Sequence, residues 1–308
     1  MKEVSAFICV TPLQSFIARR VIQEQGITDY LVMNINPHDQ QVTRNYFAQL
    51  AENAIEGDYL ILNSRIVGNY KKVSGVLRKW QKYRIVSLYL ASIDTVFAQC
   101  IIHRHPSAAL YTFDDGSVNI IPSSIYHVKP TLQMKQHAAY FCLRRHKDQD
   151  WIKRRIIKHF TIYPGMANIV EATRLHNMDL FNGHYNMVPE EGVNKSIRVF
   201  LGFNLSPKYF SAVKTINPDI YLPHPMEKRT EPWINYTSTD LIAEEYLMQL
   251  LNNFKSIELY ACNSSVLLNV RSQRIQKVVV DLYGNTSQLQ KEYNEVATLM
   301  GCKILSLI

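Results

Sequence analysis

Glycine and proline are scarce in this chain of 308 residues, which has 11 glycines and 12 prolines. Their scarcity excludes collagen-like and low-complexity classes, and a hydrophobic share of 47% excludes a largely disordered chain. No apolar run approaches the roughly 20 residues that cross a bilayer as a helix. The first apolar stretch, Val4 to Val10, is short and leads to Arg19-Arg20 instead of a cleavage site. It predicts a first strand rather than an export signal, and hence a cytoplasmic protein.

Cysteine is also scarce, and the five residues are scattered without a CxxC pair: Cys9, Cys100, Cys142, Cys262 and Cys302. An odd number at such spacings predicts reduced, mostly buried thiols and no metal or redox site. The glycine-rich dinucleotide fingerprint, the phosphate-binding P-loop and the nucleophile elbow are absent too. Dehydrogenase and NTPase activities therefore lose support.

Positive charge is in excess, with a formal net charge of +8. The excess is concentrated between Lys135 and His159, a segment that would attract anionic lipid, anionic glycan or nucleic acid without choosing among them. A solvated helix face is the ordinary interpretation of such a run. Apolar residues interleave with the cations at helical spacing and also favour an amphipathic surface helix at a membrane: Trp151, Ile152, Ile156 and Ile157.

Alternating short β-branched or aromatic runs and longer helical periodicities predict an α/β protein. The expected strands of the first half are residues 4–10, 30–34, 59–62, 84–89 and 108–113, with helices over 13–25, 42–52, 67–82 and 93–103. The polar stretch 182–195 is predicted to be an interdomain linker. Beyond it we expect strands over 198–203, 220–222, 257–262, 278–282 and 303–307, with helices over 238–253, from 264, and over 286–300. Two doubly wound Rossmann-type domains, residues 1–185 and 196–308, facing a central cleft would form a GT-B arrangement.

Asp114-Asp115-Gly116 directly follows the run 108–113 and so lies at the carboxyl end of a predicted strand. Open α/β sheets bind ligands at that end, and Gly116 permits a sharp exit that presents two carboxylates. An ordinary Asp-Gly turn is the alternative. Neighbouring carboxylates repel, which raises one pKa and suits that group to accept a proton. Strand alternation favours Asp115 as the base and Asp114 as its support, and the reverse assignment stays open.

His224 lies between two prolines, just after the predicted strand 220–222. Rigid flanks lower the entropic cost of holding an imidazole in place, although a plain loop histidine is the alternative. A second His-Pro dipeptide, His105-Pro106, precedes the strand that leads to Asp114. It falls at the opposite end of the sheet, and we assign it a structural role.

Ser264 and Ser265 follow the predicted strand 257–262 and open an apolar helical stretch. Serine hydroxyls and unpaired backbone N–H groups at a helix start can bind phosphate. An N-cap is the simpler interpretation of one serine pair. The pair is the third motif at a strand's carboxyl end, in the same domain as His224, and this favours phosphate binding.

These motifs resemble, in type and order, those of the bacterial sialyltransferases, which share an acidic-acidic-glycine, a His-Pro and a Ser-Ser motif. By size and by Phe113-Asp-Asp-Gly-Ser117 the chain resembles glycosyltransferase family 52 over most of its length. Val10-Thr-Pro-Leu-Gln14 after the first strand is similar to that family as well. The Tyr-Leu-Pro before His224 departs from some relatives, which place a lysine or glycine there. Lys228 and Arg229 follow closely and are candidates to replace it.

The resemblance implies inverting transfer of N-acetylneuraminic acid from CMP-sialic acid to a terminal galactose of lipooligosaccharide or capsule, with an α2,3 linkage expected. The first domain would hold the acceptor, with Thr11, Gln14 and Gly116 on that side, and the second would hold the donor. Asp115 would take the acceptor proton. His224 would donate to, or balance, the departing phosphate. The phosphate oxygens and the rest of CMP would contact the remaining candidates: Ser264, Ser265, Gly202, Asn204 and Pro225.

CMP carries a single phosphate, so neither a metal nor another cofactor is expected. The resemblance further implies a homodimer, contact of residues 135–159 with the inner membrane face, and no nucleic-acid partner. Two alternatives stay open. One is another GT-B transferase that uses a different CMP-nonulosonic acid or makes polysialic acid. The other is a non-enzymatic protein that binds anionic glycan or nucleic acid through the basic segment.

Overall fold

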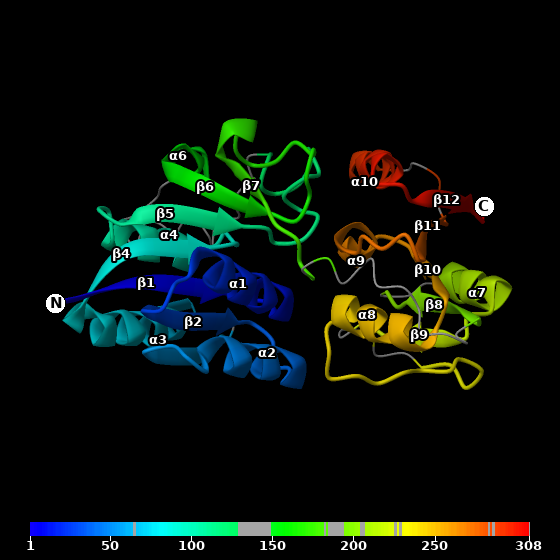
Figure 1. The fold of residues 1–308 in the computed structure, drawn as a ribbon, viewed down its shortest axis with the longest axis horizontal. Helices are drawn as coiled ribbons and strands as arrows, with labels where there is room; N and C mark the ends of the chain where they lie inside the picture. The colour runs from blue at the N-terminus through cyan, green and yellow to red at the C-terminus, as the bar shows by residue number, and fades with distance from the viewer. Residues whose placement is uncertain are drawn as a thin grey trace. The chain divides into compact units, whose positions relative to one another are not determined.

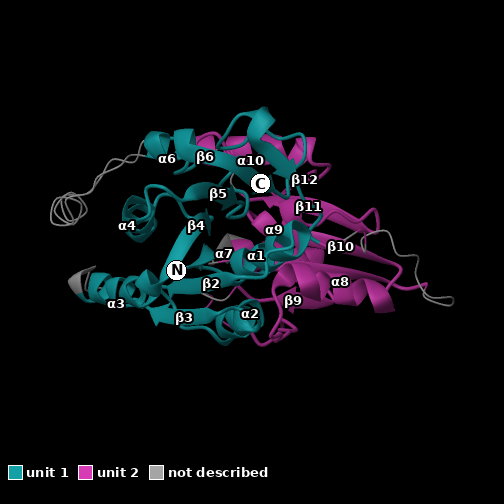
Figure 2. Cartoon of the chain, turned by 60° about the vertical axis from the view of Figure 1, so that its left-hand side comes forward, with its two compact units in different colours: residues 1–120, 124–180 teal, residues 121–123, 181–308 magenta. Residues whose placement is uncertain are grey.

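The computed structural model describes residues 1–63, 66–128, 149–181, 183, 194–203, 207–224, 227, 230–282, 284 and 287–307. The chain divides into two compact units (Figure 2). Unit 1 consists of residues 1–120 and 124–180, and unit 2 of residues 121–123 and 181–308. The grouping of residues 121–123 with unit 2 has no counterpart in the sequence prediction. Most of the expected linker, 182–195, falls outside the described residues.

Unit 1 is built on a parallel sheet in the order β3-β2-β1-β4-β5-β6-β7 (Figure 1). Its strands are β1 Lys2–Cys9, β2 Tyr30–Asn36, β3 Glu56–Ile61, β4 Tyr83–Leu90, β5 Ala109–Phe113, β6 Ile156–Thr161 and β7 Leu175–Asn177. Its helices are α1 Pro12–Gln25, α2 Gln41–Ala51, α3 Ile66–Lys79, α4 Val96–Arg104 and α6 Gln149–Arg155, with 3₁₀ turns at Trp80–Lys82 and Ala172–Arg174. Strands β2 and β3 are added on one side of β1, and β4 to β7 are added on the other. Doubly wound folds bind their ligands at the point where this direction changes, here between β1 and β4.

Alternation along β1 places its side chains on two buried faces, as expected for a sheet covered on both sides. Val4, Ala6 and Ile8 belong to a core cluster that also holds apolar residues of α3 and α4. On the other face Phe7 stacks on Tyr89 of β4, which stacks on Tyr111 of β5. The ring centroids are 4.4 and 4.7 Å apart. A row of aromatic rings therefore crosses the three strands whose ends carry the candidate site.

Unit 2 is built on a second parallel sheet, in the order β12-β11-β10-β8-β9. Its strands are β8 Ser196–Leu201, β9 Ile220–Leu222, β10 Ser256–Ala261, β11 Ile275–Asp281 and β12 Lys303–Ser306. Its helices are α7 Pro207–Ile216, α8 Ala243–Asn253, α9 Ser265–Asn269 and α10 Gln288–Leu299. The direction of chain progression reverses between β8 and β10, so a ligand is expected at that edge here too.

The predicted α/β class is confirmed, and each expected strand is present with ends within three residues of the prediction. Two strands, β6 and β7, and one helix, α7, were not predicted. The helix expected from residue 238 begins only at Ala243. Four of the five cysteines are buried free thiols, and Cys142 lies outside the described residues.

The amphipathic helix expected around residues 151–157 is confirmed only in part. Helix α6 ends at Arg155, and Ile156 begins strand β6. Ile152 and Ile156 are buried in the core of unit 1 and Trp151 packs against it, whereas Ile157 is 53% exposed. Most apolar residues of this stretch therefore cover the sheet of unit 1. Residues 135–148 lie outside the described part of the chain.

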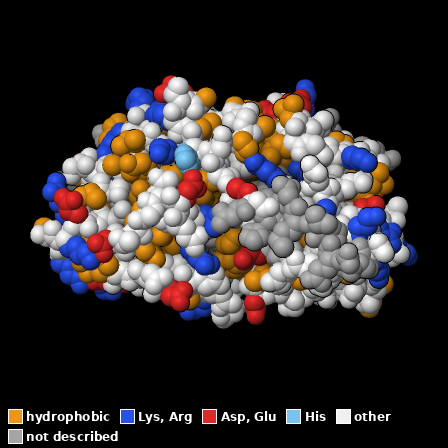
Figure 3. Space-filling model, in the orientation of Figure 1, with side chains coloured by type: hydrophobic (Ala, Val, Ile, Leu, Met, Phe, Trp, Pro, Cys, Tyr) orange, Lys and Arg blue, Asp and Glu red, His pale blue; other side chains and the backbone are white. Residues whose placement is uncertain are grey.

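No described helix is long and apolar enough to cross a bilayer. On the face shown in Figure 3, lysine and arginine side chains are dispersed among acidic and apolar ones. The described residues of that face therefore form no single basic patch.

Candidate active site

The candidate residues of unit 1 lie at the carboxyl ends of three adjacent strands. Thr11 and Gln14 follow β1, Ser92 follows β4, and Asp114 and Asp115 follow β5. Because the strands are parallel neighbours, their ends meet at one edge of the sheet. The structure thus brings together the acceptor-side residues that the sequence predicted, and it adds Ser92.

Asp114 is fully buried and bound from several directions. Its Oδ2 accepts a hydrogen bond from the backbone N–H of Ile162 at 2.6 Å. Its Oδ1 pairs with His159 Nε2 at 2.8 Å and accepts from Asn168 Nδ2 at 3.2 Å. The other ring nitrogen of His159 bonds Thr112 Oγ1 at 2.7 Å. These contacts tie the end of β5 to the end of β6, and they give Asp114 a structural task.

Asp115, the next residue, is partly exposed and surrounded by side-chain donors. Its Oδ1 accepts from Gln14 Nε2, and its Oδ2 accepts from Ser92 Oγ at 3.1 Å and from Tyr126 OH at 2.6 Å. Its backbone N–H donates to Asn119 Oδ1 at 2.7 Å. A carboxylate has about four acceptor positions, so three donors leave room for a substrate hydroxyl.

Burial raises the pKa of Asp115 above the ordinary aspartate value, and the nearby charge of Asp94 raises it further. Hydrogen bonds from Tyr126, Gln14 and Ser92 act in the opposite direction because they stabilise the charged form. The pKa of Tyr126 itself is raised well above its usual value by burial and by Asp115. Tyr126 therefore stays protonated and keeps donating, while Asp115 is a stronger proton acceptor than an exposed aspartate.

Local sequence explains how Gln14 reaches this carboxylate. Thr11 caps α1, since its Oγ1 accepts from the Gln14 N–H at 3.2 Å, and Pro12 occupies the first turn. The Gln14 side chain folds back so that its Oε1 accepts from the Val10 N–H at 2.7 Å. Its amide nitrogen is thereby directed to Ser92, at 3.0 Å, and to Asp115. Gly116 has φ 70°, the left-handed conformation that turns the chain away after the two carboxylates.

A cavity of about 230 Å³ adjoins this network. Ser92 and Thr95 contribute its polar groups, and the rest of the lining is apolar, including Val10, Leu62 and Val96. Because Ser92 also bonds Asp115, a molecule with a hydroxyl at Asp115 has an apolar recess within reach.

The candidates of unit 2 also gather at one edge of their sheet. Gly202 follows β8, His224 follows β9 and Ser264 follows β10, three adjacent parallel strands. The Gly202 N–H donates to the Leu222 carbonyl at 2.7 Å. A Cβ atom on Gly202 would lie 2.7 Å from His224 N and 2.9 Å from Pro223 Cα. Only glycine allows the backbone after β9 to approach β8 this closely.

Glu227, which the sequence analysis missed, holds the loop that carries His224. Its Oε2 accepts from the His224 N–H at 3.2 Å, and the Tyr221 hydroxyl donates to the same carboxylate at 2.8 Å. Burial raises the pKa of Glu227, and burial lowers the pKa of the His224 imidazole. His224 is exposed overall, so the loop presents its imidazole at the edge of the sheet.

Ser264 caps helix α9, with its Oγ accepting from the Val266 N–H at 3.3 Å. Its carbonyl accepts from Tyr293 OH at 2.7 Å. Ser265 is the first residue of the helix and is half-buried. The N-cap interpretation of the serine pair therefore describes Ser264. Its hydroxyl can still donate while it accepts, so phosphate binding stays a prediction.

Asn204, Pro225, Lys228 and Arg229 lie outside the described residues. Sequence reasoning missed Ser92, Tyr126, Asn119 and Glu227. Ser92 carried a usable signal, because it follows a predicted strand as Asp114 does. Tyr126 carried none, being one of 18 tyrosines in a stretch without periodicity.

Comparisons with known proteins agree on one family. Residues 28–282 match the sequence profile of glycosyltransferase family 52. A Pasteurella multocida CMP-N-acetylneuraminate:beta-galactoside alpha-2,3-sialyltransferase is 25% identical, over 91% of this chain and 92% of its own length. A Haemophilus influenzae N-acetyllactosaminide alpha-2,3-sialyltransferase is 28% identical, over 87% and 89%.

Solved structures agree on the fold. A putative UDP-N-acetylglucosamine 2-epimerase from Listeria monocytogenes superposes with a TM-score of 0.55 at 11% identity, over 98% of this chain and 91% of that one. The enzyme LpCGTa, solved in complex with UDP, gives a TM-score of 0.55 at 9% identity, over 100% and 85%. With the two parallel-sheet units, these matches establish the GT-B fold class.

Proposed function

This chain belongs to glycosyltransferase family 52, and we propose that it is an inverting sialyltransferase that moves N-acetylneuraminic acid from CMP-N-acetylneuraminic acid to the 3-hydroxyl of a terminal galactose. Two relatives with alpha-2,3-sialyltransferase names align over nine-tenths of the chain and support this donor and linkage. The observation that carries the proposal is the Asp115 network. It places a carboxylate with a raised pKa at the ligand edge of the first sheet.

The acceptor galactose binds at the edge of unit 1 in this proposal. Its hydroxyl donates to the unoccupied acceptor position of Asp115, which takes the proton as the bond to the anomeric carbon of the sialic acid forms. Gln14, Ser92 and Tyr126 keep the carboxylate oriented throughout. The apolar recess beside Ser92 accommodates a less polar part of the acceptor, such as one face of the next sugar.

The CMP donor binds at the edge of unit 2. His224 donates a proton to the departing phosphate or balances its charge, and Ser264 and Ser265 hydrogen-bond its oxygens. Burial lowers the pKa of His224, and a phosphate beside the imidazole raises it again. Donor binding would therefore charge the imidazole where protonation is useful. Gly202, Asn204 and Pro225 complete the proposed CMP side.

We propose that the reaction needs no metal, because a nucleoside monophosphate leaves with one phosphate to neutralise. The chain does contain one Asp-x-Asp spacing, Asp148-Gln149-Asp150, of the kind that can hold a divalent cation. Asp148 lies outside the described residues. Chelation is therefore the direct test of this point.

The experiment that tests the proposal measures release of CMP from CMP-N-acetylneuraminic acid, with lactose as acceptor and EDTA present. Asp115→Asn and His224→Ala are compared with two matched controls away from both edges, Asp29→Asn and His176→Ala. Lactose-dependent turnover that survives EDTA, collapses in the first pair and persists in the controls is expected. Failure of the native protein to bind CMP would overturn the proposal.

The same assay separates the alternatives. Turnover of another CMP-nonulosonic acid in preference to CMP-N-acetylneuraminic acid would indicate a different donor, and elongation of sialylated acceptors would indicate a polysialyltransferase. Steeply salt-dependent nucleic-acid binding without CMP binding would favour the non-enzymatic class.

Homodimer formation and peripheral membrane contact through residues 135–159 stay predictions. The first is tested by the mass in solution, and the second by sedimentation with anionic vesicles.

A further inference from the structure

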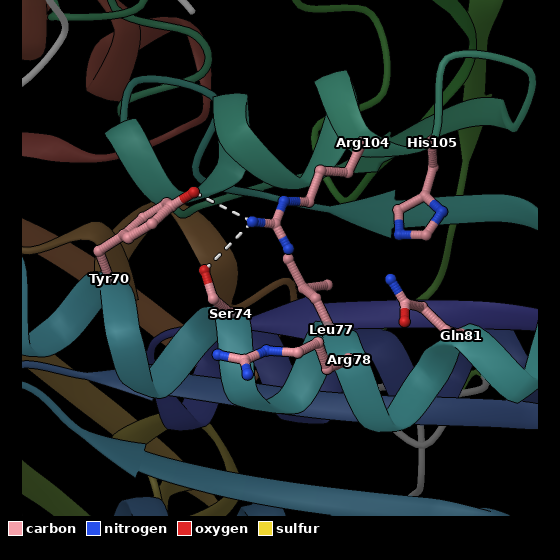
Figure 4. Close-up of a pocket in the computed structure, with 7 residues that line it drawn as sticks. All are labelled: Tyr70, Ser74, Leu77, Arg78, Gln81, Arg104 and His105. Atoms are coloured by element: carbon pink, nitrogen blue, oxygen red, sulfur yellow. Dashed lines mark hydrogen bonds between the residues drawn. The ribbon is translucent and has the colours of Figure 1, made fainter. Parts of the chain in front are cut away.

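A second cavity, of about 550 Å³, lies in unit 1 away from the Asp115 edge (Figure 4). Helix α4 begins after the carboxyl end of β4 and runs back to the edge where β5 begins, so its last residue, Arg104, marks the opposite end of the sheet. Arg104 and His105 line the cavity from that side. The rest of the lining comes from the facing helix α3 and the turn after it: Tyr70, Ser74, Leu77, Arg78 and Gln81.

The lining is positively charged. It offers two guanidinium groups, an imidazole, an amide and two hydroxyls, and the described lining residues include no carboxylate. Arg104 is held in place, since its Nη2 donates to Tyr70 OH at 3.0 Å and to Ser74 Oγ at 3.3 Å. A guanidinium fixed in this way binds an oxyanion with little further loss of side-chain entropy.

His105 has a feature that helix packing does not explain. Its Nε2 is buried and has no hydrogen-bond partner among the residues that the structure describes. Arginines near the carboxyl ends of helices are accounted for by the helix dipole, and Arg104 also fastens α4 to α3. Neither reason applies to a buried imidazole nitrogen at a cavity wall, where an unmade hydrogen bond costs free energy. A ligand with an acceptor oxygen would supply the missing bond.

We propose that this cavity binds the phosphate monoester group of a small molecule, with Arg78 and Arg104 pairing with its oxygens and His105 Nε2 donating a hydrogen bond. Two guanidinium charges match a phosphate dianion, and arginine pairs with phosphate through two parallel bonds. The volume lies in the range of small-molecule sites, and Gln81 can contact the remainder of the ligand. The proposal is independent of the sialyltransferase assignment, because no proposed donor or acceptor residue lines the cavity.

The test titrates the full-length protein, labelled at histidine, with inorganic phosphate at constant ionic strength, following the His105 imidazole resonances by NMR and affinity by calorimetry. A dissociation constant of about 1 mM or tighter is expected. Arg104→Met and His105→Asn should each weaken binding about tenfold or more. Arg84→Met, at an exposed arginine paired with Glu3, is the matched control and should leave affinity unchanged.

Two further arms make the outcome decisive. Arg78→Gln alters an exposed side chain and keeps the fold even if Arg104→Met does not, and it should weaken binding severalfold. His224→Ala removes the proposed CMP-side imidazole and should leave the His105 response intact. The proposal is overturned if the His105 imidazole resonances do not respond to phosphate. It is also overturned if that response is lost in His224→Ala and in none of the other variants. Vesicles with phosphatidic acid, compared with phosphatidylcholine alone, show whether a lipid or a soluble molecule carries the phosphate.

Discussion

The ligand edges of the two sheets are organised differently. At the first, the side chains of Gln14, Ser92 and Tyr126 donate to one carboxylate, that of Asp115, and orient it before any substrate arrives. At the second, backbone contacts do most of the positioning: Gly202 admits the chain after β9, and Glu227 binds the N–H of His224. The first edge is suited to proton transfer at a fixed atom, and the second to a ligand that supplies charge and acceptors of its own.

The largest expected effect separates two adjacent aspartates. Asp115→Asn should lower kcat/KM by about 10²–10⁴-fold with little change in stability, because it removes the proposed base. Asp114→Asn should instead reduce the free energy of unfolding by about 1–3 kcal/mol, since an amide nitrogen would face donors such as the Ile162 N–H. Steady-state kinetics and denaturant unfolding of both variants test this. Equal stability losses, or equal kinetic losses, would contradict the division of tasks.

A smaller kinetic effect is expected at the second edge. His224→Ala should lower kcat by about 10²-fold, because the phosphate then leaves without a proton or a balancing charge. A donor with a better leaving group should recover part of the rate in this variant and none in Asp115→Asn. Recovery in both variants would show that the two edges are not specialised as proposed.

Glycine substitutions test whether backbone approach organises the second edge. Gly202→Ala forces the loop after β9 to move, at a cost of about 1–3 kcal/mol, and should weaken CMP binding by about tenfold or more. Gly75→Ala is the matched control. Gly75 lies in helix α3, and a methyl group added there meets no atom within 4 Å. It should stabilise the protein by about 0.5–1 kcal/mol. Calorimetric titration with CMP and thermal unfolding give both values.

The smallest effect concerns the tuning of the first edge. Tyr126→Phe removes a hydrogen bond that stabilises the charged form of Asp115, so the pKa of that carboxyl should rise. The acid limb of the pH profile of kcat/KM should then move to higher pH, with less than about a tenfold loss on the plateau. Tyr83→Phe, which removes a hydroxyl hydrogen-bonded to Glu56, should leave the pH of the acid limb unchanged. A shift to lower pH in Tyr126→Phe would contradict the account of the network.

The positions of most strands along the chain, and the residues at their ends, were predictable because each depends on local patterns. Asp114, His224 and Ser264 follow short runs of aliphatic and aromatic residues, so their common placement at strand ends came from the sequence alone. Strand β6 was missed because Ile152, Ile156 and Ile157 fit helical spacing equally well, and short apolar runs do not distinguish the two periods. Pro207 at the start of α7 was an unused signal.

The partners of Asp115 were less accessible to sequence reasoning. Tyr126 and Asn119 contact it from an irregular segment, and only the tertiary fold brings that segment beside Asp115. Glu227 likewise acts through a turn whose shape depends on the close approach at Gly202. Side chains that hold other side chains leave no periodic trace in a single sequence.

The pairing of β1 with β4 also has a consequence for how the protein acquires activity. Residues 2–8 pair with residues 83–90, and the groups around Asp115 come from positions as far apart as 14, 92 and 126. Parallel pairing over such separations is slow, because long loops must close before any contact rewards them. Helices and local turns can form early, while the row of rings across β1, β4 and β5 must wait for all three strands. The carboxylate of Asp115 gains its hydrogen-bond partners only after these distant segments have met, and we expect this to be among the later events of folding.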